Sequence, residues 1–262
     1  MKGAVAQLHP ANLYTLDRSQ LSKGSSYFWE LRVRIGIITY ATRHLKTEQI
    51  AVGLSQRGYT DISIFALPFK PRPVREVLFA HRPDMAAGAQ TDMIARAVGA
   101  SYRAVDSAAD IDPETVDIFL IGGAGILPES FVNKALGKIL NSHPGKIPLV
   151  RGLDALKWAI LEAQPVENSL HYIDAQTDAG EMVAQFPTPL FTTDTLEKFA
   201  ARHYEIEIDM MLDFERHIGN HRTNSFVEDN VEAGVPRMRM KAEDQRNLPE
   251  AFETYKKRFA VS

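Results

Sequence analysis

Residues 116–123 read VDIFLIGG, a run of apolar and β-branched side chains that ends at two glycines. A continuous apolar run of this length is typical of a parallel strand that is buried on both faces of a sheet. Two similar runs precede it, VRIGIIT at 33–39 and ISIFA at 62–66. Between them, residues 46–57 have helical spacing, and Gly58 stands where a helix C-cap would lie. Strands that alternate with helices predict an α/β fold with right-handed crossovers.

Shorter patterns continue this alternation through the rest of the chain. Residues 85–98 have a helical pattern that ends at Gly99, and apolar side chains at helical spacing predict a last helix over 248–259. The apolar side of that helix, with Phe252, Tyr255 and Phe259, packs either on its own chain, which we expect, or on a second subunit. The sequence thus predicts a Rossmann-like, mostly parallel twisted sheet with helices on both faces. Further helices are expected over 128–136, 153–163 and from Asp194 or Thr195 to 217, and further strands over 102–105, 138–143, 169–174 and 181–186.

Composition divides the chain into three parts. Residues 1–31 show no clean period and contain a Ser-rich stretch, so we expect an N-terminal extension that is partly ordered at best. Residues 32–218 carry the alternating strands and helices and form the predicted main domain. Residues 219–262 begin with a polar stretch and form a predicted C-terminal extension that ends in a helix.

Charge and residue usage exclude several classes of function. The chain has 30 Lys and Arg against 33 Asp and Glu, a net charge of −3, which does not suit a nucleic-acid binder. It has no cysteine, so disulfides, thiolate zinc sites and cysteine nucleophiles are ruled out. No apolar run approaches the roughly 20 residues of a membrane span, and no signal peptide is visible. We therefore expect a cytoplasmic protein that does not act at a membrane.

The glycine-rich segment 121–125, IGGAG, follows the predicted strand 116–121. It differs from the G-x-G-x-x-G pattern of dinucleotide sites, and the first strand has no such loop, so no nicotinamide or flavin site is expected. Two interpretations stay open for these glycines. They form either a tight turn where backbones approach closely or a wall of backbone groups against a flat ligand.

Asn141 and His143 end the predicted strand 138–143. Residues at i and i+2 leave a strand on the same face, so both side chains point one way. An amide donates to an oxyanion, and an imidazole donates or accepts a proton near neutral pH. Asp178 follows on a later loop, where a carboxylate favours the imidazolium form of a neighbouring ring. The alternatives are polar residues at a strand end and an Asp that forms a turn before Gly180.

Five motifs follow one another along the chain: GILP at 125–128, KILNSHPGKIP at 138–148, RG at 151–152, HYID at 171–174 and DAG at 178–180. In this order they resemble the formyltransferases that use 10-formyltetrahydrofolate, a family with glycinamide ribonucleotide, methionyl-tRNA and sugar N-formyltransferases. The resemblance is strong over about residues 118–215, weaker over 33–117 and absent over 1–31. It implies that the main domain, 32–218, is a formyltransferase catalytic domain.

The resemblance also implies roles for individual residues. Asn141 would donate to the oxyanion, His143 would stabilise it and move a proton, and Asp178 would orient His143. The co-substrate would be 10-formyltetrahydrofolate, with no metal. Its pterin would lie in a pocket built largely from backbone. The residues that line this pocket by position are Gly125, Ile126 and Leu127 on one side and Ile173, Asp174 and Thr177 on the other.

Departures from the family pattern indicate the substrate. Glycinamide ribonucleotide enzymes carry an Arg where Gly125 stands and a glycine-rich phosphate loop where residues 39–44 read TYATRH. Too few residues follow the main domain for the barrel of a methionyl-tRNA enzyme, and residues 1–31 are too few for the regulatory domain of a formyltetrahydrofolate hydrolase. The remaining group, the small sugar N-formyltransferases, acts on nucleotide-linked amino sugars.

We therefore expect an N-formyltransferase for a nucleotide-linked 4-amino-4,6-dideoxyhexose in O-antigen or lipopolysaccharide biosynthesis, working as a homodimer on the family's example. Two alternatives stay open, a glycinamide ribonucleotide formyltransferase and a catalytically weak paralogue that binds folate or a partner protein. A metal-hydrolase interpretation of His143, His171 and Asp178 is weaker, since they contain no i, i+4 ligand pair. Arg43 and His44 are candidates for an anion contact or are solvated loop charges. The candidates for nucleotide binding are Tyr40, Arg43, Phe79, His81 and Arg82.

Overall fold

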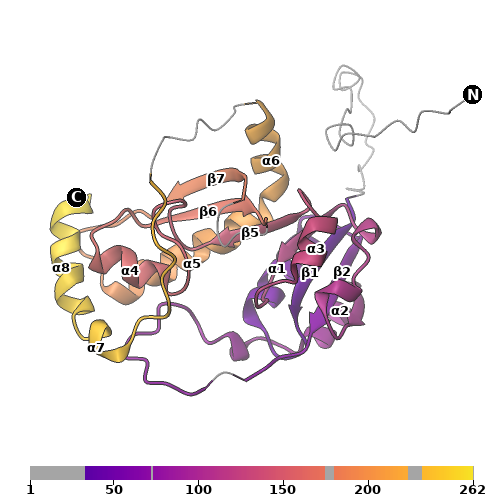
Figure 1. Ribbon diagram of the computed structural model, residues 1–262, viewed down its shortest axis with the longest axis horizontal. Coiled ribbons are helices and arrows are strands. Elements are labelled where there is room, and N and C mark those ends of the chain that lie inside the picture. Colours follow the sequence, from indigo (N-terminus) through magenta and orange to yellow (C-terminus); the bar gives the residue numbers. More distant parts are fainter. Residues whose placement is uncertain (1–32, 72, 175–179, 224–231, 262) are drawn as a thin grey trace, which may run out of the picture. The chain divides into compact units, whose positions relative to one another are not determined.

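A seven-stranded sheet with the order β3-β2-β1-β4-β5-β6-β7 forms the centre of the fold (Figure 1). The computed structural model describes residues 33–71, 73–174, 180–223 and 232–261, all within one unit, Leu31–Ser262. Neighbouring strands from β3 to β5 are parallel, whereas β6 and β7 are antiparallel. The predicted mostly parallel α/β sheet is therefore confirmed. The strands are β1 (Ile35–Tyr40), β2 (Ile62–Leu67), β3 (Ser101–Ala104), β4 (Ile118–Ile121), β5 (Ile139–His143), β6 (Glu167–Tyr172) and β7 (Met182–Pro187).

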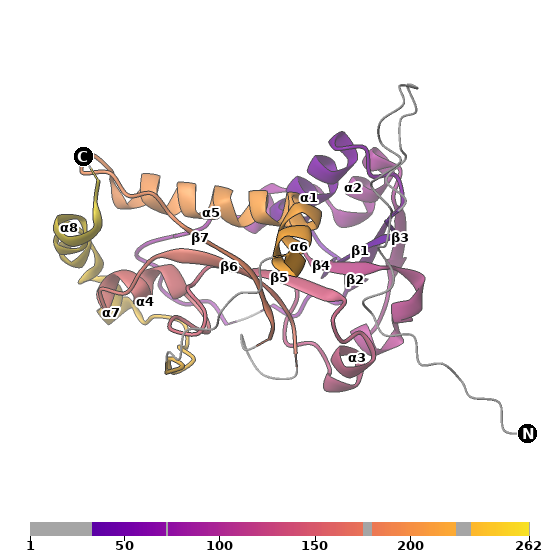
Figure 2. The ribbon, with the colours of Figure 1, turned by 90° about the horizontal axis from the view of Figure 1, so that it is seen from above.

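Helices cover both faces of this sheet. In Figure 2, α1, α2 and α5 lie on one side of the strands and α3 lies on the other. Short 3-10 turns at Met85–Ala87, Ala108–Asp110 and Pro113–Thr115 join the strands of the first half. The helices are α1 (Leu45–Gln56), α2 (Thr91–Val98), α3 (Glu129–Lys134), α4 (Ala155–Leu161), α5 (Leu196–Leu212), α6 (Phe214–Thr223), α7 (Ala242–Gln245) and α8 (Leu248–Phe259).

Alternate residues of the central strands enter two different hydrophobic clusters. Ile37 and Leu120 pack with α1, α2 and α5 on one face. Ile38 and Phe119 pack with Phe131 of α3 on the other. This alternation is the two-residue period of a strand, and it explains why β1 and β4 read as continuous apolar runs.

The C-terminal helix α8 belongs to a third cluster. Its Phe252 and Tyr255 are buried with Phe199 of α5 and with apolar residues of α4. The two aromatic rings of Phe199 and Phe252 lie 5.8 Å apart. The expectation that this helix packs on its own chain is confirmed.

Two predicted helices are interrupted. The predicted helix 85–98 is split by residues 88–90, because Gly88 lies so close to α1 that an added Cβ would be 2.4 Å from the Leu45 nitrogen. The predicted helix to 217 breaks at Asp213, where α5 ends and α6 begins. The break lets Phe214 enter the first cluster, 5.8 Å from the ring of Tyr59. Tertiary contacts override helical spacing at both places.

Membrane insertion finds no support among the helices. Within the described residues, no helix combines the length and the apolar character that a bilayer crossing requires.

Candidate active site

Asn141 and His143 leave the end of β5 together, as the sequence predicts. β5 lies between β4 and β6, with Asn141 opposite His171 and His143 opposite Ser169 in the antiparallel pair. His143 is buried, and Asn141 is partly buried. The two side chains that carry the predicted chemistry are therefore held by a central strand rather than by a loop.

His171 orients the amide of Asn141. Its Nδ1 lies 3.1 Å from the Tyr172 carbonyl, and its Nε2 lies 3.3 Å from Asn141 Nδ2. A carbonyl only accepts, so Nδ1 carries the hydrogen and the neutral ring accepts from the amide through Nε2. This bond uses one of the two amide hydrogens of Asn141. The other amide hydrogen of Asn141 has no hydrogen-bond partner among the described residues.

His143 is fixed by the backbone of the loop that follows it. Its Nε2 donates to the Val150 carbonyl at 2.9 Å. In the neutral ring Nδ1 is then the basic nitrogen, the atom that takes up a proton. Gly145 makes this geometry possible, because an added Cβ would lie 2.7 Å from His143 Nε2 and 2.5 Å from the Val150 oxygen. Glycine therefore follows the Asn-x-His-Pro motif for a steric reason.

Ile173 and Asp174 directly follow β6. The Ile173 amide donates to the Ile139 carbonyl at 2.8 Å, and the Tyr172 amide donates to the Glu181 carbonyl at 2.9 Å. Gly180 approaches Tyr172 so closely that an added Cβ would meet its carbonyl oxygen at 1.8 Å. The two ends of the loop are thus pinned together. Thr177 and the predicted catalytic Asp178 lie between them, outside the described residues.

The predicted pterin walls share one hydrophobic cluster. Leu127 and Ile173 both pack against the cluster of Ile121, Phe131 and Ile139. Ile126 is fully exposed, and Gly125 is exposed as well. Leu127 and Ile173, one from each predicted wall, are therefore linked through one hydrophobic cluster.

Gly122 and Gly123 have a packing role. A Cβ on Gly123 would lie 2.5 Å from His44 Nε2, and a Cβ on Gly122 would lie 2.7 Å from Thr47 Oγ1. His44 is the N-cap of α1, and its ring accepts from the Thr47 amide. The sequence left open a close approach or a wall against a flat ligand. The structure shows close approach at these two glycines, and the approaching groups are the side chains of His44 and Thr47.

His44 is neither an exposed loop charge nor a protonated anion ligand at neutral pH. Burial, together with the charges of Lys46 and Arg82, lowers its pKa to about 4. The neutral ring caps the helix whose N-terminus would otherwise offer its amides to an anion. Arg43 also has a structural partner, because its Nε donates to the Ala86 carbonyl at 2.9 Å.

A buried charge cluster, Lys46–Glu207–Arg82, lies next to this cap. Glu207 of α5 is 1% exposed and accepts from Lys46 Nζ at 2.6 Å and from an Arg82 guanidinium nitrogen at 2.5 Å. The two cations lower the pKa of Glu207 to about 2 against the effect of burial. Two positive charges thus face one carboxylate, and the Arg82 side chain keeps 32% of its surface exposed.

The segment 78–82 brings His81 and Arg82 to this region. Gln245 holds the segment, since its Oε1 accepts from the amides of Leu78 and Phe79 and from Lys157 Nζ, each at 3.1 Å. Burial and the charge of Arg82 lower the pKa of His81 to about 3.

The rings of two nucleotide candidates, Phe79 and Tyr40, have contacts within the fold. Lys157 Nζ lies 5.9 Å from the centre of the Phe79 ring. Tyr40 packs edge-on against Phe69, with ring centres 5.4 Å apart.

Sequence reasoning missed His171, Val150, Lys46 and Glu207 as partners of the site. Position along the chain gave no signal for them. The His171 contact depends on strand register, the Lys46–Glu207 contact on the packing of distant helices, and the Val150 contact on the path of the loop after His143.

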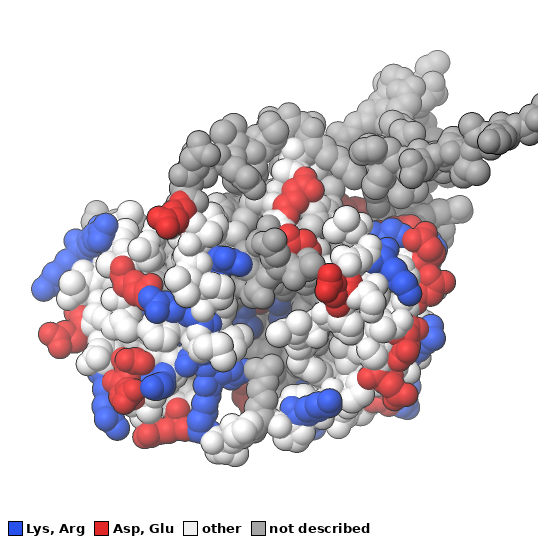
Figure 3. Space-filling view, viewed as in Figure 1, with Lys and Arg blue, Asp and Glu red and all other residues white. Residues whose placement is uncertain are grey.

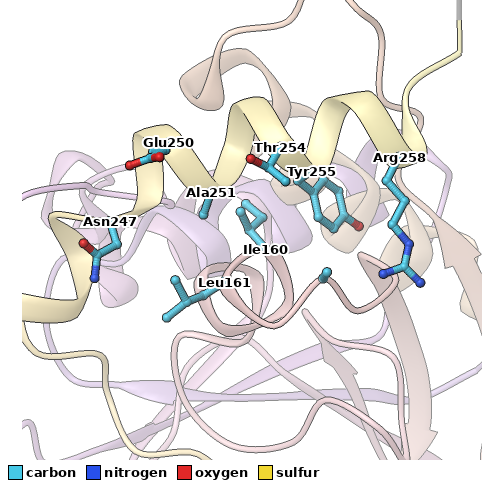
Figure 4. Close-up of a pocket in the computed structure, with 9 residues that line it drawn as sticks. Ile160, Leu161, Asn247, Glu250, Ala251, Thr254, Tyr255 and Arg258 are labelled. Carbon is cyan, nitrogen blue, oxygen red and sulfur yellow. The ribbon is translucent and has the colours of Figure 1, made fainter.

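A cavity of about 430 Å³ lies elsewhere, between α4 and α8 (Figure 4). Ile160 and Leu161 form its apolar side, and Tyr255 reaches it from α8. The Tyr255 hydroxyl is engaged by the Gln164 carbonyl and the Val166 amide. None of the predicted catalytic or cofactor residues that the structure describes lines this cavity. Across the described ranges, no group of three or more His, Asp or Glu side chains is arranged to hold a metal ion.

The comparison with protein families matches the description "Formyl transferase" over residues 76–214, just over half of the chain. This chain belongs to the formyl transferase family. The matched range contains Asn141, His143 and the 178–180 motif. It ends within α6, so the last two helices lie beyond it.

Curated relatives share part of this range. A phosphoribosylglycinamide formyltransferase of Haemophilus influenzae is 36% identical over 95 residues, which is 35% of this chain and 44% of the relative. A trifunctional purine biosynthetic protein of Gallus gallus is 36% identical over 125 residues, 46% of this chain and 12% of the relative. The matches span less than half the length of these relatives.

Solved structures share the fold. A glycinamide ribonucleotide transformylase from Symbiobacterium toebii aligns with a TM-score of 0.52 at 17% identity, covering 82% of this chain and all of that one. A 4-N formyltransferase from Francisella tularensis aligns with a TM-score of 0.53 at 16% identity, covering 82% of this chain and 78% of that one. At these identities the likeness supports the fold and leaves the substrate open.

Proposed function

We propose that this chain transfers a formyl group from 10-formyltetrahydrofolate to the amine of a nucleotide-linked amino sugar. The observation that carries the proposal is the pair Asn141 and His143 at the end of β5, each oriented by a defined partner, in a chain of the formyl transferase family. A cytoplasmic location and a homodimer remain predictions.

The described residues fit the folate co-substrate. Leu127 and Ile173 are partly buried apolar side chains that pack against one cluster, and their apolar character suits the flat face of a pterin. Gly125 leaves space, because an added Cβ would meet only the Tyr40 hydroxyl, at 3.7 Å. When bound, 10-formyltetrahydrofolate supplies the electrophilic formyl carbon.

The residues of the site then have separate tasks. Asn141 donates its second amide hydrogen to the oxygen on which negative charge develops, which is the role of an oxyanion hole. His171 fixes the direction of that donor. His143 takes up or releases a proton at Nδ1 while Val150 holds Nε2. We assign to Asp178 the orientation of the His143 ring and the stabilisation of its charged form.

The charge cluster favours an anionic amine substrate. Lys46 and Arg82 both pair with the single carboxylate of Glu207, although burial lowers the pKa of Lys46. The charges of Arg82 and His143 both act on the buried ring of His203, which supports a location of the charge cluster near His143. A nucleotide diphosphate would supply compensating negative charge. The self-capped N-terminus of α1 argues against a phosphate cradle made by its amides.

Basic side chains extend this surface. The charges of Arg75 and Arg239 add to burial in lowering the pKa of Lys157 on α4. Figure 3 shows Lys and Arg over α4, α7 and the chain beside them, with Asp and Glu among them. The basic members of this mixed surface offer contacts to an extended anionic substrate.

Glycinamide ribonucleotide is the second candidate. The relative from Haemophilus influenzae is described as a phosphoribosylglycinamide formyltransferase and is 36% identical over the matched segment. The loop at 39–44 without glycine and the exposed Gly125 count against that substrate. A catalytically weak paralogue is the third possibility.

One assay separates these functions. Purified protein and 10-formyltetrahydrofolate are incubated with glycinamide ribonucleotide, with nucleotide-linked 4-amino-4,6-dideoxysugars, or with no amine. Folate release is followed by absorbance and the formamide by mass. We expect a formamide from one of the sugars and none from the ribonucleotide.

Two variants control the assay. Asn141→Ala should lower the rate about 10²-fold or more, since it removes an oxyanion donor. Asn133→Ala changes an exposed amide on α3 and should leave the rate unchanged. Formamide from the ribonucleotide alone would overturn the sugar proposal. Folate release without any amine would indicate a hydrolase, and no product in any reaction would favour the binding paralogue.

A further inference from the structure

His203 of α5 is buried beneath the loop that follows His143. It is 2% exposed, and its Nε2 lies 3.2 Å from the carbonyl oxygen of Pro144. Its Nδ1 lies 2.7 Å from Thr188 Oγ1 and 3.0 Å from Asn168 Nδ2. A single imidazole thus connects α5, β6 and the residue after β7 to the backbone next to the predicted catalytic histidine.

The direction of these hydrogen bonds follows from Asn168. Its Nδ2 also lies 2.9 Å from the His203 carbonyl oxygen, which only accepts. The amide nitrogen must therefore face both this carbonyl and Nδ1. A reversed amide would place two oxygens 2.9 Å apart. The Asn168 oxygen then has no partner among the described residues, which shows that the carbonyl contact decides the orientation.

The tautomer of His203 is fixed as a result. Nδ1 accepts from Asn168 and Thr188, so the single hydrogen of the neutral ring is on Nε2 and is donated to Pro144. Burial keeps the ring neutral by lowering its pKa to about 4. The charged or titratable groups that act on it are Glu207, Arg82 and His143, and His81 lies near enough to be influenced by it.

Strand pairing no longer supports the backbone at this point. The last register pair of β5 and β6 is His143 with Ser169, and Pro144 has no amide hydrogen to donate. Beyond His143, hydrogen bonds from side chains replace the strand-to-strand hydrogen bonds of β5 and β6. Ser169 Oγ donates to the Gly145 carbonyl at 2.7 Å, and Gln185 Nε2 donates to the Ile147 carbonyl at 2.5 Å. The carbonyl of Pro144, the residue after His143, accepts instead from His203.

We propose that His203 is a positioning residue, whose Nε2 hydrogen holds the Pro144 carbonyl and thereby sets the backbone from which His143 projects. The inference rests on the proposed function only in its kinetic part. A displacement of about 1 Å in a reacting group can cost 10²-fold in rate. The loss should fall on kcat, because the hydrogen bonds of the His203 ring go to Pro144, Thr188 and Asn168, and none of these is a predicted substrate-binding residue.

The test compares three variants. His203→Leu removes the donor, and His203→Gln retains an amide N–H at about the position of Nε2. His217→Leu is the matched control, because His217 is a buried histidine on α6 that packs on Phe186 at 5.1 Å and takes no part in the site. We expect His203→Leu to lower kcat by 10- to 100-fold with KM within threefold of the wild type. His203→Gln should recover most of this loss, and His217→Leu should leave kcat unchanged.

A second measurement needs no turnover. In protein labelled with 15N in the histidine rings, NMR should show neutral His203 with hydrogen on Nε2 from pH 5.5 to 8, and His203→Gln should preserve the ring signals of His143. If the chain transfers no formyl group, the NMR measurement still tests the role of His203. A failure of the proposed function can therefore be distinguished from a failure of this inference. Hydrogen on Nδ1, a kcat for His203→Leu within threefold of the wild type, or a Gln variant no better than Leu would overturn it. If the Leu variant does not fold, the Gln variant and the ring signals remain decisive.

Discussion

Glu207→Gln should strongly destabilise the fold, because it removes the one carboxylate that Lys46 and Arg82 share. The pKa of Glu207 falls from 4.5 to about 2 in the folded protein, and at about 1.4 kcal/mol per unit this is worth about 3 kcal/mol. Removing one partner of a buried ion pair costs about 3–5 kcal/mol, since it leaves buried charge uncompensated. We therefore expect the free energy of unfolding to drop by about 3–5 kcal/mol and the Tm to fall by about 10 °C.

Urea unfolding followed by circular dichroism measures this loss, and its pH dependence gives a second check. A carboxyl group with a lowered pKa in the folded state contributes stability above its ordinary pKa of 4.5 and loses it as the pH falls towards about 2. The difference in the free energy of unfolding between wild type and variant should therefore have its full value at pH 7 and become smaller below pH 4.5. Glu114→Gln is the matched control, because Glu114 is 76% exposed and pairs with Lys138 at 2.9 Å. It should cost about 0.5 kcal/mol or less. A loss below about 1 kcal/mol for Glu207→Gln would refute the reasoning.

Four further outcomes are expected. Asp178→Asn should keep the fold and lose most activity in the formyl-transfer assay, because the carboxylate would no longer stabilise a charged His143. Gly123→Ala should destabilise the protein by about 1–3 kcal/mol in urea unfolding, since the new methyl would overlap the ring of His44. Both His44 and His203 have pKa values lowered by burial to about 4, so the wild-type free energy of unfolding should fall as the pH drops from 6.5 towards 4. Phe252→Ala should cost about 3–5 kcal/mol in the same unfolding experiment, because it empties a fully packed position.

Each of these has an outcome that contradicts it. An Asp178→Asn rate within a few-fold of the wild type would remove Asp178 from the mechanism. If Gly123→Ala leaves the free energy of unfolding unchanged, the His44 ring must be free to move away from the new methyl group. A flat stability profile between pH 6.5 and 4 would show that both rings accept protons in place, and a small effect of Phe252→Ala would mean that α8 is loosely attached.

The periodicity of the sequence was sufficient to predict most of the fold. The continuous apolar run before Gly122 is a strand because it is buried on both faces, and every predicted strand has a counterpart in the sheet. The breaks at 88–90 and at Asp213 were not predictable in this way. Gly88 is placed by α1, and Asp213 lies where Phe214 turns into the core, so both depend on residues far away in sequence.

The candidate site was predictable where its residues share one strand. Asn141 and His143 lie two residues apart, so the strand period alone puts them on one face. The partner of Asn141 depends on the antiparallel register of β5 and β6, which places His171 opposite it. Lys46 and Glu207 are 161 residues apart, and only the packing of α1 on α5 brings them together. The glycines before Ala124 had two interpretations, which only the position of the His44 ring could separate.

The hold of Gln245 on the segment 78–82 has a consequence for the order of folding. The amide of Leu78 and the side chain of Gln245 are 167 residues apart in sequence. A growing chain therefore synthesises this segment long before its anchor exists, and contacts of such separation form after local ones. We expect the sheet and α5 to assemble first, before His81 and Arg82 reach their native positions. Arg82 then forms its ion pair with Glu207 only after the C-terminal residues have docked on α4, so this buried charge cluster is among the last parts of the molecule to be completed.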